Sequence, residues 1–212
     1  MKIVMLAYPG LTPLDLMGPL QVWSLWPAAE IQVVWKTTDP IPTDTGMSIV
    51  PTHSFESCFE SPDILFAPGG TQPTFDLMAD KTTIDFLKAK GAKAQWVTSV
   101  CTGALLLGSA GLLDGYKATT HWAAHVMLET VGAIPTQGRY VIDRNRATGG
   151  GVTAGIDFGL AMVAQIAGDE LAKTIQLALE YSPQPPFNSG SPADASEATI
   201  QRVLEGFNGA GD

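Results

Sequence analysis

Cysteine is scarce in this chain, since its 212 residues contain only two. Cys58 and Cys101 lie in unrelated segments, so we expect no disulfide framework, as in proteins of a reducing cytoplasm. Metal-ligand patterns are missing as well. His121 and His125 have the spacing of a zinc-binding helix, but no glutamate of a zincin motif stands between them. The sequence therefore predicts no metal site.

Positive charge is also in short supply. Lys and Arg number 12 against 21 Asp and Glu, which gives a formal net charge of -9. Such a chain is repelled by phosphate backbones and by anionic lipid surfaces. No apolar run has the length of a membrane span, and residues 1–8 are too short for a signal peptide before Pro9-Gly10. We expect a cytoplasmic protein that binds neither nucleic acid nor membranes.

Short apolar runs alternate with amphipathic ones along the chain. We expect strands at residues 3–7, 31–36, 64–67 and 95–100, and helices at residues 14–25, 82–90, 102–110, 152–181 and 193–207. Apolar strands joined by helical crossovers predict an α/β fold, with a doubly wound, mostly parallel sheet between two layers of helices. We expect one domain over residues 1–212, with a proline-rich C-terminal arm over residues 182–212.

Cys101 stands where a β-branched run, residues 96–100, passes directly into a helix-forming run. Its sulfur would face the first N–H groups of that helix, which favour a thiolate over a thiol. Cys101 is therefore a candidate nucleophile. A free cysteine is equally often a small buried hydrophobe, and position alone leaves the two interpretations open. Cys58 has no such strand-to-helix change after it and is given no role.

Two further side chains are candidates to assist the sulfur. Asp15 is flanked by apolar residues shortly after the first strand, at the sheet edge where Cys101 is expected. It either caps the following helix or holds a proton in a desolvated site and hydrogen-bonds the sulfur. His121 follows Cys101 by one helix and one short strand. It is either a base for the thiol or a histidine fixed by the start of the next helix.

Glycine-rich turns follow three of the expected strands, at residues 68–71, 101–103 and 148–153. Together they can bring backbone N–H groups to one crevice, although each alone is typical of a tight turn. None matches a phosphate loop or a dinucleotide fingerprint, so we expect no nucleotide cofactor. Asp157, near the start of a helix, is interpreted as a structural residue that suits the helix dipole.

Several of these motifs together resemble the DJ-1/PfpI superfamily. The resemblance covers nearly the whole chain and is carried by Leu14-Asp15-Leu16-x-Gly18-Pro19, Ala67-Pro68-Gly69-Gly70, Ser99-Val100-Cys101-Thr102-Gly103, Gly111-Leu112-Leu113-Asp114-Gly115 and Ala118-Thr119-Thr120-His121-Trp122. Within it, residues 148–158 and the arm segment 179–192, which contains Pro185-Pro186-Phe187-Asn188, are similar to bacterial isocyanide hydratases.

The resemblance implies roles for named residues. Cys101 would be the nucleophile and Asp15 its carboxylic partner, with backbone donors and a pocket wall at Gly70, Thr102, Gly150 and Val152. Thr102 follows the cysteine where protease-like and some glyoxalase-like branches have histidine, so a built-in Cys–His dyad is missing. His121 matches a histidine that relatives place near the cysteine, without implying contact with the sulfur.

The implied activity is hydration of an isocyanide to an N-substituted formamide, through a covalent thioimidate on Cys101 and without a cofactor. The resemblance also implies a homodimer. Two alternatives stay open. One is a ligand- or redox-sensing module, related to the sensor domains of AraC-type regulators; against it, the chain is acidic and ends at Asp212 without a helix-turn-helix region. The other is a glyoxalase- or deglycase-like enzyme acting on dicarbonyls.

Overall fold

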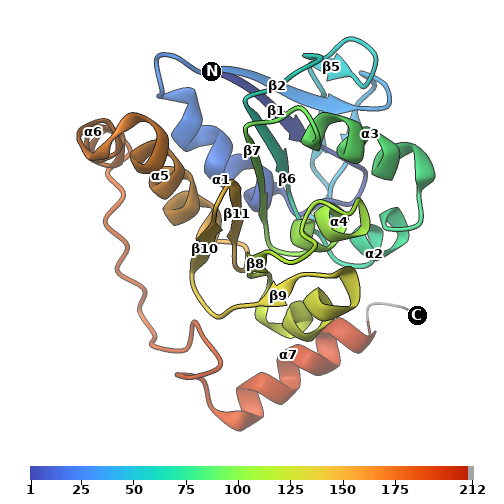
Figure 1. The fold of residues 1–212 in the computed structure, drawn as a ribbon. Coiled ribbons are helices and arrows are strands. Elements are labelled where there is room, and N and C mark those ends of the chain that lie inside the picture. Colours follow the sequence, from blue (N-terminus) through green and yellow to red (C-terminus); the bar gives the residue numbers. More distant parts are fainter. Residues whose placement is uncertain (210–212) are drawn as a thin grey trace.

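The computed structural model describes residues 1–209 and contains a seven-stranded central sheet (Figure 1). The strand order is β10-β11-β7-β6-β1-β2-β5, and only the β10–β11 pair is antiparallel. The bounds are β1 Lys2–Leu6, β2 Glu30–Trp35, β5 His53–Ser54, β6 Ile64–Ala67, β7 Trp96–Val100, β10 Tyr140–Asp143 and β11 Arg146–Gly149. The predicted doubly wound, mostly parallel sheet is confirmed, and the four predicted strands lie within one residue of their observed bounds.

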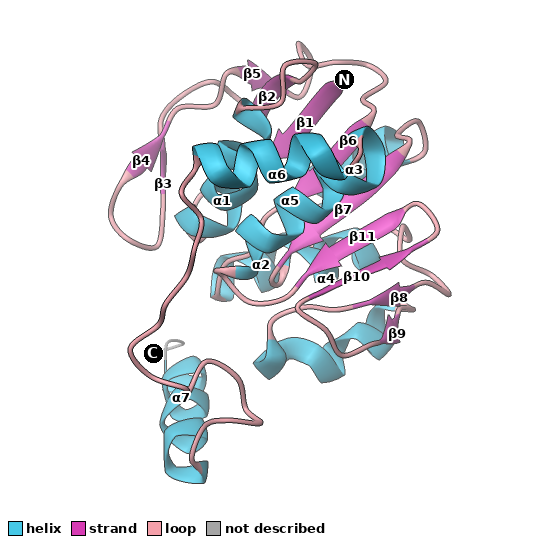
Figure 2. Cartoon of the chain, turned by 90° about the vertical axis from the view of Figure 1, so that its left-hand side faces the viewer, coloured by secondary structure: helices cyan, strands magenta, loops and turns pink. Residues whose placement is uncertain are grey.

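Helices cover both faces of this sheet, which explains why its central strands are buried along almost their whole length. On one face lie α1 (Pro13–Ser24), α5 (Ala154–Ala167) and α6 (Asp169–Ala178), seen in front of the sheet in Figure 2. On the other lie α2 (Gln72–Leu77), α3 (Lys81–Gly91), α4 (Gly103–Ser109) and the 3₁₀ helix η1 (Trp122–Val131). The predicted helices at residues 14–25, 82–90 and 102–110 correspond to α1, α3 and α4.

The core on the α1–α5 side is built around three aromatic rings. The Trp23 ring meets Phe66 edge-on at 5.6 Å between centroids and Phe158 at 5.9 Å. Its indole N–H donates to the carbonyl of Gly159, 3.1 Å away. A Cβ atom on Gly159 would stand 3.1 Å from Val22 Cβ, so glycine lets the two helices approach closely. This packing holds α1, which carries Asp15, against the sheet.

Several short elements were not predicted. Strands β5 and β10, and the small pairs β3 (Ile41–Pro42) with β4 (Ser48–Ile49) and β8 (Lys117–Ala118) with β9 (Ile134–Pro135), have two to four residues each. Runs of this length carry too little hydrophobic periodicity to stand out from loops.

The single helix predicted over residues 152–181 is wrong. The chain breaks at Gly168, whose φ of +94° lies in a region that favours glycine, and continues as the separate helix α6. Apolar periodicity continues across the break because both helices pack their apolar sides against the molecule. The pattern therefore hid a change in chain direction.

The C-terminal arm leaves α6 and runs as irregular chain to α7 (Glu197–Gly209), which lies below η1 in Figure 1. The helix predicted to begin at residue 193 begins four residues later. The Ser191 hydroxyl instead donates to Asp194 in a turn, and Ser196 receives the N–H of Thr199 at the helix start. Residues 210–212 of the predicted arm lie outside the described part of the chain.

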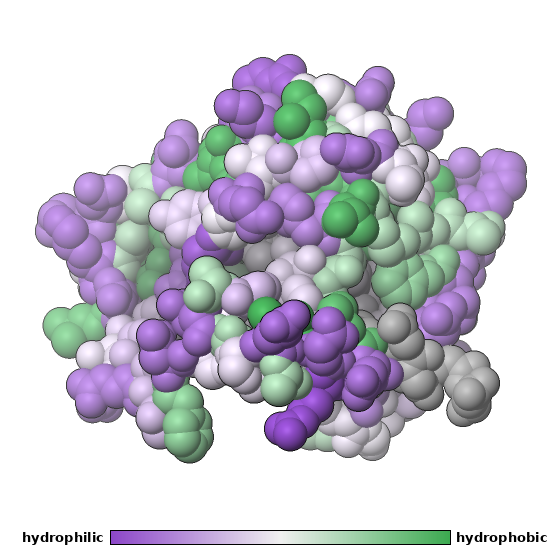
Figure 3. All heavy atoms as spheres, turned by 90° about the horizontal axis from the view of Figure 1, so that it is seen from below, coloured by the Kyte–Doolittle hydropathy of each residue, from purple (hydrophilic) through white to green (hydrophobic). Residues whose placement is uncertain are grey.

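The lower face of the molecule, seen in Figure 3, carries hydrophilic and hydrophobic side chains side by side. Among the helices of residues 1–209, none is long and apolar enough to cross a membrane.

Candidate active site

Cys101 occupies a strained turn between β7 and α4. Its φ is +56°, in the left-handed region that non-glycine residues rarely adopt. The Cys101 N–H donates to the carbonyls of Gly149 (3.1 Å) and Gly150 (2.8 Å). The hydroxyl of Thr120 donates to the Cys101 carbonyl at 2.7 Å. These bonds fix the backbone of the turn and hold the sulfur at the carboxyl edge of the sheet.

The helix after the cysteine lies unusually close to β6. A Cβ atom on Gly103 would stand 2.2 Å from the carbonyl oxygen of Ala67, so only glycine fits there. A Cβ atom on Gly69 would likewise stand 2.7 Å from the Thr102 nitrogen and 2.8 Å from Asp15 Oδ2. The two glycine-rich turns therefore meet, and Asp15 reaches the point where they meet.

Asp15 lies in the first turn of α1 and is fully buried. Thr12 occupies the N-cap position, so the helix-cap interpretation of Asp15 does not describe its place. Burial raises the pKa of the Asp15 carboxyl from 3.8 to about 7, while the Cys101 thiol and the Gly69 N–H lower it in part. Within residues 1–209, no cation pairs with this carboxyl, and neither oxygen has a hydrogen-bond partner of standard geometry.

The expectation that the helix start favours a thiolate is wrong for the resting protein. Cys101 is 5% exposed, and burial raises the pKa of its thiol well above the ordinary value. The neighbouring Asp15 charge raises it further, and the Thr102 N–H opposes both only in part. Helix α4 has only seven residues, and its N-terminus does not outweigh desolvation.

Thr102 ties the two glycine turns together through its side chain. The Gly70 N–H donates to Thr102 Oγ1 at 3.0 Å, and that hydroxyl donates to the Gly70 carbonyl at 2.7 Å. Thr102 keeps its own N–H toward the sulfur, where it lowers the pKa of Cys101. The Gly70 N–H is thus engaged by a side chain, so its role as a donor to substrate stays a prediction.

Sequence reasoning missed a buried hydroxyl network behind Thr102. Tyr8 Oη lies 2.7 Å from Thr74 Oγ1, and Thr102 Oγ1 lies 3.2 Å from the same atom. The Tyr8 hydroxyl also donates to the Pro68 carbonyl at 3.2 Å. The only available signal was that Tyr8 follows the first strand, at the same sheet edge as Asp15.

His121 is held by the helix that it begins. Its Nδ1 accepts the N–H of Ala123 at 3.3 Å, at the N-cap of η1, and burial lowers the pKa of its ring. A Cβ atom on Gly151 would stand 2.8 Å from His121 Cδ2, so the ring lies against the third glycine turn. His125 contacts the Thr136 carbonyl instead, with its Nε2 3.2 Å away.

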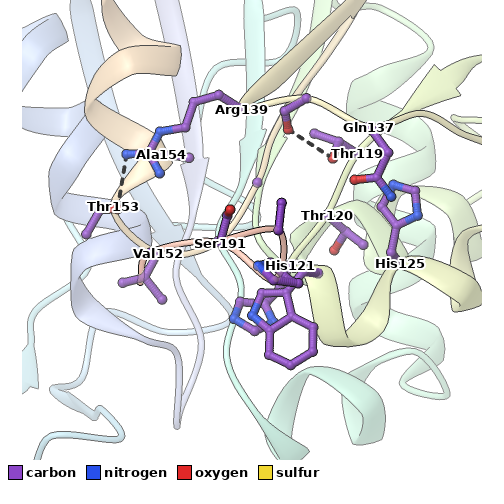
Figure 4. Close-up of a pocket in the computed structure, with 17 residues that line it drawn as sticks. Thr119, Thr120, His121, His125, Gln137, Arg139, Val152, Thr153, Ala154 and Ser191 are labelled. Carbon is purple, nitrogen blue, oxygen red and sulfur yellow. Dashed lines mark hydrogen bonds between the residues drawn. The ribbon is translucent and has the colours of Figure 1, made fainter. Parts of the chain in front are cut away.

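A cavity of about 830 Å³ opens beside the nucleophile turn (Figure 4). Gly150 and Val152 are the predicted site residues that line it, together with His121, whereas Cys101, Asp15, Gly70 and Thr102 do not. Thr120 and Gly150, which both hydrogen-bond the Cys101 backbone, line it together with Val152. Residues of η1, of the segment before β10 and of the arm complete the wall, among them His121, Trp122, Arg139 and Ser191. In the part of the chain that the structure describes, no group of three His, Cys, Asp or Glu side chains is arranged to hold a metal ion.

The mostly parallel sheet between helices and the cysteine at positive φ between β7 and α4 define the class of protein. It is an α/β protein with a cysteine on a strand-to-helix turn. The model of the DJ-1/PfpI family matches residues 1–165, and the chain belongs to this family.

Two relatives match almost the whole chain. The isonitrile hydratase of Pseudomonas putida is 46% identical over 96% of this chain and 88% of its own length. A crystal structure of a ThiJ/PfpI family protein from Pseudomonas syringae is 48% identical, covers 96% of this chain and 84% of that chain, and superposes with a TM-score of 0.94. The HTH-type transcriptional regulator GbdR of Pseudomonas aeruginosa is 37% identical over 43% of this chain and 26% of its own length.

Proposed function

We propose that this protein is an isocyanide hydratase, in which Cys101 is the nucleophile and Asp15 the general acid and base. The observation that carries the proposal is the buried pair itself. A carboxyl with a pKa of about 7 beside a buried thiol holds a proton that it can give or take near neutrality. The similarity to the Pseudomonas putida isonitrile hydratase supports this substrate class.

In the first half of the reaction, the Cys101 sulfur bonds to the terminal carbon of R–N≡C. The proton held by the Asp15–Cys101 pair moves to that same carbon. The product is a thioimidate, R–N=CH–S–Cys101, in which the thiol hydrogen has been transferred and no other atom is lost. Because Asp15 is desolvated, it delivers this proton without competition from bulk water.

In the second half, water adds to the thioimidate carbon. Asp15 takes a proton from the water, and the imine nitrogen receives one, giving R–NH–CH(OH)–S–Cys101. The C–S bond then breaks, the carbonyl forms, and the sulfur recovers its proton through Asp15. The released product is the formamide R–NH–CHO.

Backbone donors complete the proposed site. The Thr102 N–H faces the sulfur and stabilises negative charge there as it develops. Gly70 is the second proposed backbone donor. Its N–H is bonded to the Thr102 hydroxyl and becomes available to a ligand only if that hydroxyl turns away. We assign no step to a metal or a cofactor, and His121 is given no proton-transfer role.

We further propose a cytoplasmic homodimer. Several large apolar side chains project into solvent, among them Leu177 of α6 (82% exposed), Phe187 of the arm (79%) and Val126 of η1 (78%). A second copy of the chain would cover some of them.

The test is formamide formation from an aryl isocyanide, followed by absorbance. Cys101→Ala is expected to abolish turnover. Asp15→Asn keeps the size of the side chain but cannot titrate, and it is expected to lower kcat at least about 100-fold. Cys58→Ser is the matched control, because Cys58 lies far from the elbow in sequence and its sulfur contacts the Phe55 carbonyl. Undiminished hydration by Cys101→Ala would refute the proposal.

The second candidate is a sensing module, favoured by the partial match to GbdR. It predicts tight, stoichiometric ligand binding without turnover in the same assay. A dicarbonyl-processing enzyme predicts consumption of methylglyoxal instead.

A further inference from the structure

The first part of the C-terminal arm forms one side of the cavity next to the nucleophile turn. Gly190, Ser191, Pro192 and Ala193 all line it, on the side facing the third glycine turn and the start of α5. Figure 4 shows Ser191 on the same cavity as His121 and Val152. A segment that follows the fold proper in sequence thus completes a wall of the candidate site.

The arm is anchored where it leaves α6. Glu180 has a φ of +50°, which turns the chain away from the helix, and the Tyr181 N–H donates to the Gln176 carbonyl at 3.1 Å. The Tyr181 hydroxyl then donates to Asp157 Oδ1 at 3.0 Å. The root of the arm is therefore bonded to the first turn of α5.

Asp157 also bonds Arg139, which lines the cavity. The Arg139 Nε donates to Asp157 Oδ2 at 2.7 Å, and its Nη2 donates to Thr153 Oγ1 at 3.1 Å. The Arg139 carbonyl accepts the N–H of Gly150 at 2.9 Å. We name Arg139, Asp157 and Tyr181 the anchor cluster. Asp157 thus has a charged partner and a hydroxyl partner beyond the helix dipole that its position suggested.

The anchor cluster is linked to the nucleophile turn by two backbone hydrogen bonds through Gly150. Gly150 receives the Cys101 N–H through its carbonyl and gives its own N–H to Arg139. Two residues that line the cavity, Thr120 and Gly150, are therefore bonded directly to the Cys101 backbone, although Cys101 itself does not line it. A ligand that approached the sulfur from this cavity would have the arm on one side of it.

We propose that the arm is a wall of the substrate pocket and limits the size of the substituent on the reacting carbon, and that the anchor cluster positions it. The ligand class is an isocyanide with a bulky, mainly apolar substituent, which would lie between Trp122, Val152 and the residues around Pro192. The ligand class rests on the proposed hydration. The role of the arm does not, because it concerns access to Cys101 by any reagent.

Alkylation of Cys101 measures this access without turnover. In a Cys58→Ser background, the rates with iodoacetamide and N-(1-naphthyl)iodoacetamide are compared at pH 8.5. The sulfur displaces iodide from the CH₂ carbon, and the thiol proton goes to the buffer. The quantity of interest is the ratio of the bulky to the small reagent's rate, which cancels changes in the reactivity of the sulfur itself.

Two variants change the wall in opposite directions. Ala193 lines the cavity and is exposed, so Ala193→Phe adds a ring at the side of the cavity that the arm forms, and this variant is expected to lower the ratio at least about tenfold. Tyr181→Phe removes one hydroxyl of the anchor cluster and is expected to raise the ratio about threefold. The controls are Gln184→Phe, which adds the same ring to an exposed part of the arm, and Tyr140→Phe, which removes a neighbouring tyrosine hydroxyl.

Unchanged ratios in both Ala193→Phe and Tyr181→Phe would overturn the proposal, as would equal effects in the controls. The same variants are then assayed with methyl and naphthyl isocyanides. If the alkylation ratios shift as expected and the parent hydrates neither isocyanide, the arm keeps its role and the proposed function fails. If the parent hydrates both isocyanides, and the variants change neither the alkylation ratio nor the ratio of naphthyl to methyl isocyanide hydration, the function stands and the inference about the arm fails.

Discussion

The buried carboxyl of Asp15 predicts an unusual dependence of stability on pH. An ordinary paired aspartate stabilises a protein as the pH rises, because its pKa is lower in the folded state. Asp15 has the opposite shift, since burial raises its folded pKa from 3.8 to about 7. Between these two values the folded protein binds one proton more than the unfolded chain. The free energy of unfolding must therefore fall as the pH rises through this window.

The magnitude follows from the width of the window. Each pH unit between the two pKa values removes about 1.4 kcal/mol, so the loss between pH 4 and pH 8 is about 4 kcal/mol. Above pH 8 the contribution of Asp15 is flat, because the group is ionised in both states. A loss of about 4 kcal/mol is a large part of the 5–15 kcal/mol that typically holds a domain together.

The assay is urea denaturation at intervals from pH 4 to pH 8.5 for the parent and for Asp15→Asn. Other acids titrate alike in both proteins, so the difference between the two unfolding free energies isolates Asp15. We expect this difference to shift against the parent by about 4 kcal/mol across the range, with its midpoint between the two pKa values. A difference that stays constant with pH would show that Asp15 ionises normally, and the acid–base role proposed for it would lose its basis.

Two further predictions concern the hydroxyl of Thr102 and the assembly. Thr102→Val leaves the buried Gly70 N–H without its acceptor, so urea denaturation should show a loss of about 1–3 kcal/mol in the free energy of unfolding. Steady-state kinetics of this variant should show a fall in kcat that is larger than any rise in KM. The control is Thr98→Val, which removes a buried hydroxyl bonded to the Leu65 carbonyl and should lower stability but leave kcat unchanged. Light scattering at micromolar concentration should give twice the 22.4 kDa chain mass, and a mass of one chain would contradict the dimer.

The elements with long apolar patterns were predictable from the sequence. Strands β1, β2, β6 and β7 and helices α1, α3 and α4 each carry enough apolar residues to show their period. The break at Gly168 was not, because one glycine inside a periodic run is compatible with a continuous helix. Only the direction in which α6 packs decides between a continuous helix and two separate helices.

The candidate site divides in the same way. Cys101 and Asp15 could be chosen from the sequence because a cysteine at a strand end and an acid among apolar residues are both unusual for their surroundings. Whether the thiol is ionised could not be predicted from the sequence. The sequence shows that a helix starts after Cys101, but it does not show the burial that raises the pKa of the thiol more than the helix start lowers it. The sequence did not indicate that Arg139 and Tyr181 bind Asp157, because these three residues lie far apart along the chain.

The left-handed backbone at Cys101 bears on both function and stability. A side chain at this φ is strained relative to glycine by about 1–2 kcal/mol. Cys101→Gly relieves this strain, but it also removes a buried side chain and adds conformational entropy to the unfolded chain, so the variant should lose activity with little change in its free energy of unfolding. A screen of variants for thermostability alone would therefore not detect the loss of the thiol and should be paired with an activity screen.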